Sequence, residues 1–306
     1  MKKIFLFLSI IIVVSLACDI SVNISPTSEV PTVATTPIPV IDPPTPTPKV
    51  FISLTQAIPA TDVPSATPTG GTAVTFGSLS LVIPSSVASG ASGQDYPRKD
   101  AEDAAYWQKT PGHLQVSLGD YYALQGKFHE PQIYVYPALG YAQLVPAAFE
   151  SMHRLRNVMN GPDTSISVDQ LPAVPFFNAA QIFASNVQDI SFQNGEGVRF
   201  LTEYAQYAAP VNNHELIYHF QGFTDDGEYY VVAILPITAP VLAEASDPGS
   251  PLPPGGVPYP FMADPNADMQ SYYSSVTDLL NGTPPEAFTP TINQLDLMIQ
   301  SMQITQ

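Results

Sequence analysis

The sequence predicts an α+β domain: a mainly antiparallel sheet with a C-terminal meander, and helices packed on one or both faces as in an α/β/α sandwich. The first observation is a series of three alternating aromatic and β-branched runs between Gly197 and Ile237, separated by turn residues. The second is the order of the chain, with strands, one helix, more strands and two terminal helices. The third is length, since roughly 235 residues follow a proline-rich tract, enough for one large core.

The turns of the meander predict which side chains share a face. Their positions place Gln221 opposite Tyr230, and Thr202 opposite Tyr218. One face is then apolar core, made of Val198, Phe200, Tyr204, Leu216, Tyr218, Phe220, Tyr229, Val231 and Leu235. The other is mixed, and we expect helices or long loops to cover part of it. It collects Arg199, Leu201, Glu203, Ile217, His219, Gln221, Tyr230, Val232 and Ile234.

Hydrophobic periodicity predicts the remaining elements of a single domain over residues 73–306. The expected strands cover 73–83, 114–124, 131–136 and 187–193, and the expected helices begin at Pro146 and cover about 264–280 and 289–302. The helix from Pro146 should bury Val145, Phe149, Met152 and Leu155, and the last helix Ile292, Leu295, Ile299 and Met302. Residues 85–111, with one short helical turn, and 163–177 should be irregular, and 239–262 should form a long mobile loop.

The N-terminus has the features of an export signal. Lys2 and Lys3 precede an apolar run over 4–17, so residues 1–17 are predicted to be a signal peptide. The run is too short to span about 30 Å of hydrocarbon comfortably, which argues against a permanent transmembrane helix.

The end of this run, Ser15-Leu16-Ala17-Cys18, resembles the lipobox of bacterial lipoproteins. The resemblance implies that Cys18 is lipidated and becomes the mature N-terminus, which anchors the protein to the outer face of the cell membrane. The chain departs from the pattern at Ser15, where leucine is usual. Ser15 and Ala17 also suit ordinary signal peptidase, so a secreted form stays open. Cys18 is the sole cysteine, which excludes an internal disulfide.

Residues 18–72 form a second predicted region, rich in proline and threonine after the anchor site. This composition cannot bury a core and favours an extended, disordered chain. Directly behind a lipid anchor it predicts a stalk that holds the domain away from the membrane. The alternative is a neutral low-complexity linker.

Charge excludes several classes of partner. The formal net charge is −17, and after residue 73 the cationic side chains are Arg98, Lys99, Lys109, Lys127, Arg154, Arg156 and Arg199. This supply cannot form a basic patch, so we expect no nucleic-acid partner and no binding to anionic lipid headgroups.

No sequence motif indicates a metal, a cofactor or a catalytic centre. The run Asp264 to Asp268 imitates half a calcium loop, but Met269 replaces the required glycine, so helix capping by Asp264 explains it better. The five histidines lack metal-site spacing, and there is no G-x-S-x-G or phosphate loop. Asp225 and Asp226 belong to ordinary turn chemistry.

The polar side of the meander is the candidate ligand site. It is predicted to bring together Arg199, Glu203, His219, Gln221 and Tyr230. His219 would be the group that titrates near neutral pH, and the loop over 239–262 would be the lid. The alternative is a half-solvated sheet face with a weak Arg199–Glu203 pair.

The element order over residues 73–306 is loosely similar to the PsbP-like α/β/α sandwich of small exported proteins. With no catalytic motif, we expect a non-catalytic binding or accessory module of the cell envelope, whose ligand or envelope partner the sequence does not name. The alternatives are an extracytoplasmic hydrolase that uses carboxylates from loops, and a structural surface protein.

Overall fold

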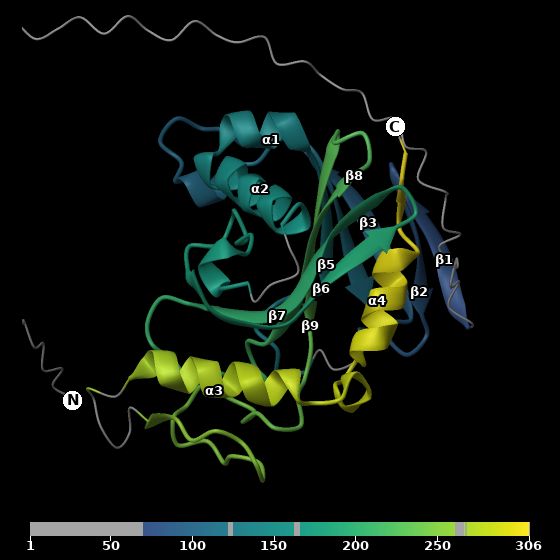
Figure 1. The fold of residues 1–306 in the computed structure, drawn as a ribbon. Coiled ribbons are helices and arrows are strands. Elements are labelled where there is room, and N and C mark those ends of the chain that lie inside the picture. The colour runs from purple at the N-terminus through teal and green to yellow at the C-terminus, as the bar shows by residue number, and fades with distance from the viewer. Residues whose placement is uncertain (1–69, 122–124, 162–165, 261–265, 267, 306) are drawn as a thin grey trace, which may run out of the picture. The chain divides into compact units, whose positions relative to one another are not determined.

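The computed structural model describes residues 70–121, 125–161, 166–260, 266 and 268–305 (Figure 1). The chain divides into two units, Met1–Ala60 and Thr61–Gln306. The predicted signal peptide, Cys18 and the stalk up to residue 69 lie outside the described residues. Of the helices that are described, none is long and apolar enough to cross a membrane.

Seven strands of the described chain form one antiparallel sheet, in the order β3-β4-β5-β9-β8-β7-β6 (Figure 1). They are β3 (Gly90–Tyr96), β4 (His113–Gly119), β5 (Gln132–Pro137), β6 (Ala180–Phe192), β7 (Gly195–Ala205), β8 (Ile217–Thr224) and β9 (Tyr229–Pro236). The predicted meander is confirmed as β7, β8 and β9. It lies inside the sheet, with β6 beside β7 and β5 beside β9.

A smaller sheet contains β1 (Gly71–Phe76), β2 (Leu79–Pro84) and β10 (Gln303–Ile304). The single strand predicted over 73–83 is therefore wrong, because the chain reverses at Gly77 and Ser78. Gly77 has a φ of 50°, which suits the tight primed turns of hairpins. β10 pairs with the edge of β2 that faces away from β1, so it is the third strand of this sheet.

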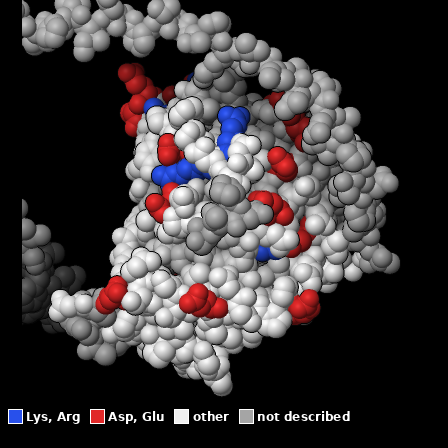
Figure 2. Space-filling view, viewed as in Figure 1, with Lys and Arg blue, Asp and Glu red and all other residues white. Residues whose placement is uncertain are grey.

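Helices cover both faces of the large sheet, which confirms the α+β class (Figure 1). On one side lie α1 (Ala138–Leu144) and α2 (Pro146–Met159). On the other lie α3 (Met269–Asn281) and α4 (Ile292–Gln300), together with the small sheet. On the molecular face in Figure 2, acidic side chains are spread out and Lys and Arg are few.

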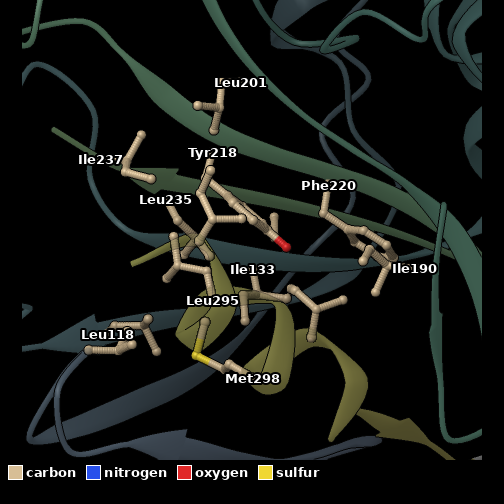
Figure 3. Close-up of a cluster of buried hydrophobic side chains, with 14 of the residues drawn as sticks. Leu118, Ile133, Ile190, Leu201, Tyr218, Phe220, Leu235, Ile237, Leu295 and Met298 are labelled. Atoms are coloured by element: carbon tan, nitrogen blue, oxygen red, sulfur yellow. The ribbon is translucent and has the colours of Figure 1, made fainter. Parts of the chain in front are cut away.

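The larger core lies between the sheet and α4 (Figure 3). Leu295 and Met298 of α4 are fully buried, as are Tyr218 and Leu235 of the sheet. The predicted inward face of this helix is confirmed, since Ile292, Leu295, Ile299 and Met302 are at most 1% exposed.

The second core lies under α1 and α2 and is rich in aromatic rings. Tyr136, Phe200 and Tyr230 come from the sheet, and Met152 and Leu155 from α2. Phe149, which was expected on the buried face of α2, is 58% exposed. Ala148 and Ser151 are buried there instead, because small side chains let the helix lie close to the sheet.

The register of the meander differs from the prediction. Thr202 lies opposite Ile217, one residue from the predicted Tyr218. Successive side chains point to opposite faces, so this single step exchanges the faces of β7 relative to β8. Gln221 lies opposite Val232, a two-residue difference that leaves the faces of β8 and β9 as predicted.

Other differences involve weak local signals. β3 lies within 85–111, which was expected to be irregular, and α1 and the first half of β6 were also missed. Asp268, and not Asp264, caps α3, since its side chain accepts hydrogen bonds from the backbone N–H groups of Gln270 and Ser271. Asp264 itself lies outside the described residues.

The long segment after β9 has neither α-helix nor strand as far as the structure describes it, to Pro260. Its first part is fixed, because Asn213 Nδ2 donates to the carbonyls of Ala239 and Leu242 at 3.1 and 3.2 Å. Tyr259, in its last part, packs edge-on against Tyr272 of α3 at 5.4 Å. Residues 261 and 262 lie outside the described part.

Candidate functional site

The five residues of the predicted ligand site do not share a face. Arg199 and Glu203 point toward the side of α3 and α4, while His219, Gln221 and Tyr230 point toward α2. All five are buried, with at most 4% of their surface exposed. The prediction of one shared polar face is therefore wrong, because of the one-residue register step between β7 and β8.

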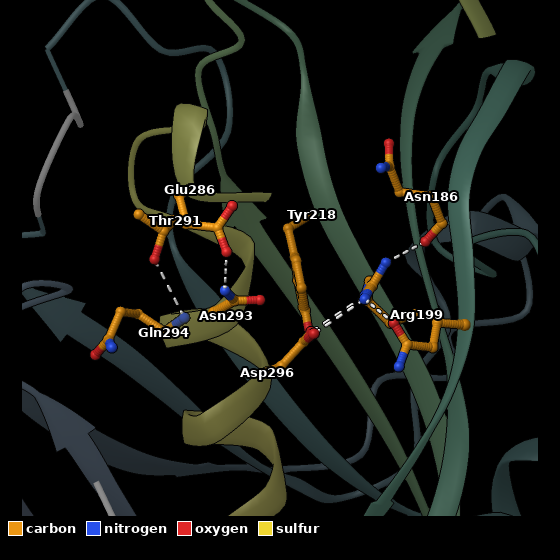
Figure 4. A network of polar contacts seen from close by, with 9 residues as sticks. Asn186, Arg199, Tyr218, Glu286, Thr291, Asn293, Gln294 and Asp296 are labelled. Carbon is orange, nitrogen blue, oxygen red and sulfur yellow. Dashed lines mark hydrogen bonds and ion pairs between the residues drawn. The ribbon is translucent and has the colours of Figure 1, made fainter. Parts of the chain in front are cut away.

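Arg199 is held by a buried network that ties the sheet to α4 (Figure 4). Its Nε and Nη2 donate to the two carboxylate oxygens of Asp296 at 3.1 and 2.9 Å. Its Nη1 donates to the carbonyl of Asn186, and its Nη2 also to Oε1 of Gln188. The hydroxyl of Tyr218 donates to the same Asp296 at 2.7 Å. All three nitrogens of the guanidinium therefore donate to groups inside the protein.

Gln221 is the centre of a second buried network, under α2. Its Oε1 accepts hydrogen bonds from the hydroxyls of Ser151, at 2.9 Å, and Tyr230. Its Nε2 donates to Nε2 of His219 at 2.7 Å and to the carbonyl of Ala173 at 3.1 Å. The amide thus joins strand, helix and loop, and presents no polar atom to a cleft.

Glu203 is a buried carboxyl group beside a second glutamate. Its oxygens accept hydrogen bonds from the backbone N–H and Nδ2 of Asn212 at 3.1 and 3.0 Å. Burial raises the pKa of Glu203 well above its usual value, and a hydrogen bond with the carboxyl group of Glu215 raises it further. Glu203 therefore holds its proton at a pH where ordinary glutamates have lost theirs.

A cavity among the described residues opens beside Glu215, at the end of β7. Its volume is about 430 Å³, within the size range of small-molecule sites. We call it the aromatic pocket, because rings form much of its wall. The lining residues are Phe128, His129, Phe176, Phe177, Asn178, Ala179, Tyr204, Ala205, Gln206, Tyr207, Ala209 and Glu215.

The rings of the pocket are fixed against one another. Phe177 stacks on His129 at 5.1 Å between ring centres and meets Tyr204 edge-on at 5.0 Å. The hydroxyl of Tyr204 accepts a hydrogen bond from the backbone N–H of Val174 at 3.0 Å. Tyr204 belongs to the rigid sheet, so the loop that carries Phe177 is positioned from β7.

A short loop before β5 forms another part of the wall and carries Phe128 and His129. The backbone N–H of Phe128 donates to the carbonyl of His214 at 2.8 Å. The ammonium of Lys127 donates to the carbonyls of Asn213 and Ile237 at 2.5 and 2.8 Å. These bonds hold the loop while the ring of Phe128 stays 66% exposed.

His129 and Tyr207 give the pocket its polar and exposed parts. Burial, with a smaller contribution from His214, lowers the pKa of His129 to about 4, so the ring is neutral near pH 7. Its Nε2 is buried and has no hydrogen-bond partner among the described residues. Tyr207 is 73% exposed. The pocket thus combines a neutral imidazole with open aromatic surface.

No protein-family model matches this chain, and no curated protein matches it in sequence. Function therefore has to be argued from the pocket itself.

The rest of the described chain contains weaker candidates for a functional site. Two smaller cavities have volumes of about 180 Å³ each, one beside α2 and one beside α3. Among the described residues there is no group of three or more His, Cys, Asp or Glu placed to share a metal ion. The aromatic pocket is accordingly the best candidate site.

Sequence reasoning missed this pocket because its walls come from distant segments. Phe128 belongs to a short connection, Phe177 to a region expected to be an irregular loop, and Tyr204 to a strand face expected to be core. A cluster of aromatic residues at the ends of predicted elements was the available signal. Only the pairing of the strands shows that these ends converge.

Proposed function

We propose that this protein is an exported lipoprotein, anchored through Cys18, whose domain is a non-catalytic binding module of the cell envelope. The ligand is a small molecule or a short chemical group that enters the aromatic pocket. The observation that carries the proposal is the pocket itself, with a ligand-sized volume and a preformed ring wall. A structural surface protein would need no such cavity.

The pocket is preformed, which favours binding. Phe177 is packed between His129 and Tyr204, and Phe128 is held through its backbone. A ligand therefore need not order these rings, and the conformational entropy cost of association is small. Rigid aromatic surface with a few polar groups is the usual composition of a small-molecule site.

A hydrolase remains the second candidate because of the Glu203–Glu215 pair. Two glutamates that share a hydrogen bond, one with a raised pKa, resemble the acids that donate protons in enzymes. However, Glu203 is fully buried and both of its oxygens are bonded to Asn212. Only Glu215 of the two lines the pocket. A single reachable acid favours binding over hydrolysis.

The binding proposal is tested by ligand-observed NMR with a set of small probes: a pyranose, a blocked dipeptide, an indole and an alkylammonium. At least one probe is expected to bind the wild-type domain saturably. Its binding should fall in Phe128→Ala and Tyr207→Ala, which remove exposed rings of the pocket. Phe149→Ala is the matched control, because it removes an exposed ring on α2 outside the pocket. No binding by any probe, or equal loss in all three variants, would refute the proposal.

The export and anchor proposals need a separate experiment. Cells that express the full chain are labelled with a fatty-acid analogue, alongside a Cys18→Ala variant. We expect label in the wild type and none in the variant. A secreted, unlabelled product that begins at Cys18 would remove the lipid proposal and keep export.

A further inference from the structure

We propose that the ligand of the aromatic pocket is a small organic cation, an alkylammonium or quaternary ammonium group held against the rings with Glu215 as its counter-charge. This inference rests on the proposed binding function and names its ligand class. It follows from two features of the pocket: its rings and its charge.

The rings supply the contact surface for a cation. Five of the lining residues are Phe or Tyr: Phe128, Phe176, Phe177, Tyr204 and Tyr207. The face of an aromatic ring carries negative charge density, so it attracts a cation that has lost part of its water shell. Several rings around one cavity are the usual protein solution for quaternary ammonium groups, which have no N–H to donate.

The charges around the pocket have the sign that a cation requires. Among the described residues that line it, none is Lys or Arg, and Glu215 supplies a carboxyl group. Lys127 is next to Phe128 in the chain, but its ammonium is turned to the carbonyls of Asn213 and Ile237. The chain carries a formal charge of −17, and acidic residues predominate on the face in Figure 2. Anionic ligands are disfavoured on the same ground.

Glu203 lies beside Glu215 and does not reach the pocket. It is fully buried, and burial raises its pKa well above the usual value, which favours its neutral form. Glu215 is the one acidic residue among those that line the pocket, so one carboxyl group faces one ammonium.

His129 does not oppose a cation in the pocket. Burial is the main cause that lowers the pKa of this ring to about 4, so the ring is neutral near pH 7. A neutral His129 avoids the repulsion that a charged imidazole would exert on a cation.

The test compares choline with its neutral isostere, 3,3-dimethylbutan-1-ol, by NMR titration of the purified domain. The two have nearly the same shape and differ in charge. We expect choline to bind roughly tenfold more tightly, a ratio that corresponds to cation–π attraction from more than one ring. Butylammonium should bind at the same site.

Variants then assign the effect to the pocket. Glu215→Gln is expected to weaken choline binding roughly threefold to tenfold and to leave the isostere unchanged. Glu196→Gln is the matched control, an exposed acid of β7 outside the pocket, and should change nothing. Because Glu215 contacts the buried Glu203, Tyr207→Ala is a second test; its ring is 73% exposed, so folding does not depend on it. The Tyr207→Ala variant should also bind choline more weakly than the wild type does.

The outcomes separate this inference from the proposed function. If the isostere binds as tightly as choline, or if the pyranose or indole probe binds the pocket and choline does not, the cation inference is overturned and the binding module stands. If none of the first NMR probes binds, and neither choline, its isostere nor butylammonium binds, both the binding-module proposal and the cation inference are refuted. A preference for choline that is lost in Glu215→Gln and Tyr207→Ala and kept in Glu196→Gln supports the inference.

Discussion

Arg199 of β7 and Asp296 of α4 form a two-point ion pair across the larger core, with N–O distances of 3.1 and 2.9 Å. Their side chains are only 5% and 13% exposed. Such a pair adds little over a well-packed apolar pair, since the transfer of two charges from water is costly. The ion pair instead fixes the position of α4 on the sheet, because only one placement of the helix brings the two charges together.

We predict that Asp296→Asn destabilises the domain by about 3–5 kcal/mol, because the guanidinium of Arg199 is then buried without its anion. The double variant Arg199→Met, Asp296→Leu should recover much of this loss, since no charge remains buried. Urea unfolding of the domain measures both changes.

Glu150→Gln is the control for this prediction. It breaks the Arg154–Glu150 pair on α2, an exposed i,i+4 contact at 3.1 Å. Its expected cost is below about 1 kcal/mol. If Asp296→Asn costs no more than this control, the ion pair does not fix α4.

The register of the meander shows what the sequence could and could not predict. The three strands and their turns were visible, because alternation and turn residues are local signals. The pairing of Thr202 with Ile217 was not, because every residue of β8 is buried. A strand that is buried on both faces has no polar face to fix its register.

The connection before β8 explains why the predicted register is one residue out. Asn212 accepts a hydrogen bond from the backbone N–H of Glu215 at 3.2 Å, and Asn213 binds the carbonyl of Ala239. These contacts make the segment a packed connection rather than a simple hairpin loop, so its length does not indicate the pairing. The candidate site changed with it, since Arg199 and His219 fell on opposite faces.

The short or weakly patterned elements could not be predicted from local sequence patterns either. β3 contains Gly90 and Gly93 and few β-branched residues, and it is mostly exposed at the sheet edge. Its conformation is imposed by pairing with β4. By contrast, the strong periodicity of α4 was sufficient to predict the helix, although its Thr291 cap and its start at Ile292 lie after the expected start near residue 289.

Gln221 provides a second stability prediction, in the core under α2. Gln221→Leu leaves the ring of His219 without its donor. The hydroxyls of Ser151 and Tyr230 lose an acceptor but lie 3.1 Å from each other, and Ser151 also donates to the carbonyl of Ala173 at 2.6 Å. An unsatisfied buried group costs about 1–3 kcal/mol, so we expect a loss of about that size in thermal or urea unfolding. Ser151→Ala removes one partner of the network and should cost clearly less. An equal loss in the two variants would contradict a role for Gln221 at the centre of the network.

His219 predicts how stability responds to acid. Burial lowers its pKa from 6.5 to about 3, opposed in part by the carbonyl of Ala233. Between these values the unfolded chain binds a proton that the folded protein does not, so stability falls as pH falls. The slope is about 1.4 kcal/mol per pH unit for one such group.

We therefore expect His219→Gln to lose less stability than the wild type between pH 6.5 and about pH 4. The measurement is the free energy of unfolding in urea at several pH values. His153→Gln, which replaces an exposed histidine of α2, should keep the wild-type slope. Parallel curves for wild type and His219→Gln would show that the histidine is not held neutral.

Glu203 has the opposite effect to His219 on how stability changes with pH. Its pKa in the folded protein is raised by burial and by Glu215, so below the unfolded value of 4.5 both states hold the proton. As pH rises, the unfolded chain releases the proton first, and stability is lost until the folded-state pKa is passed. Glu203→Gln removes the ionisable group and keeps one of the two oxygens that accept from Asn212, so it shifts the stability but not through proton release.

We expect the variant to gain stability relative to the wild type as pH rises above 4.5, whereas Glu196→Gln, at an exposed site, should follow the wild type. Unfolding in urea from pH 4 to 8 measures the difference. A constant gap between Glu203→Gln and wild type would mean that folding does not raise the pKa of Glu203.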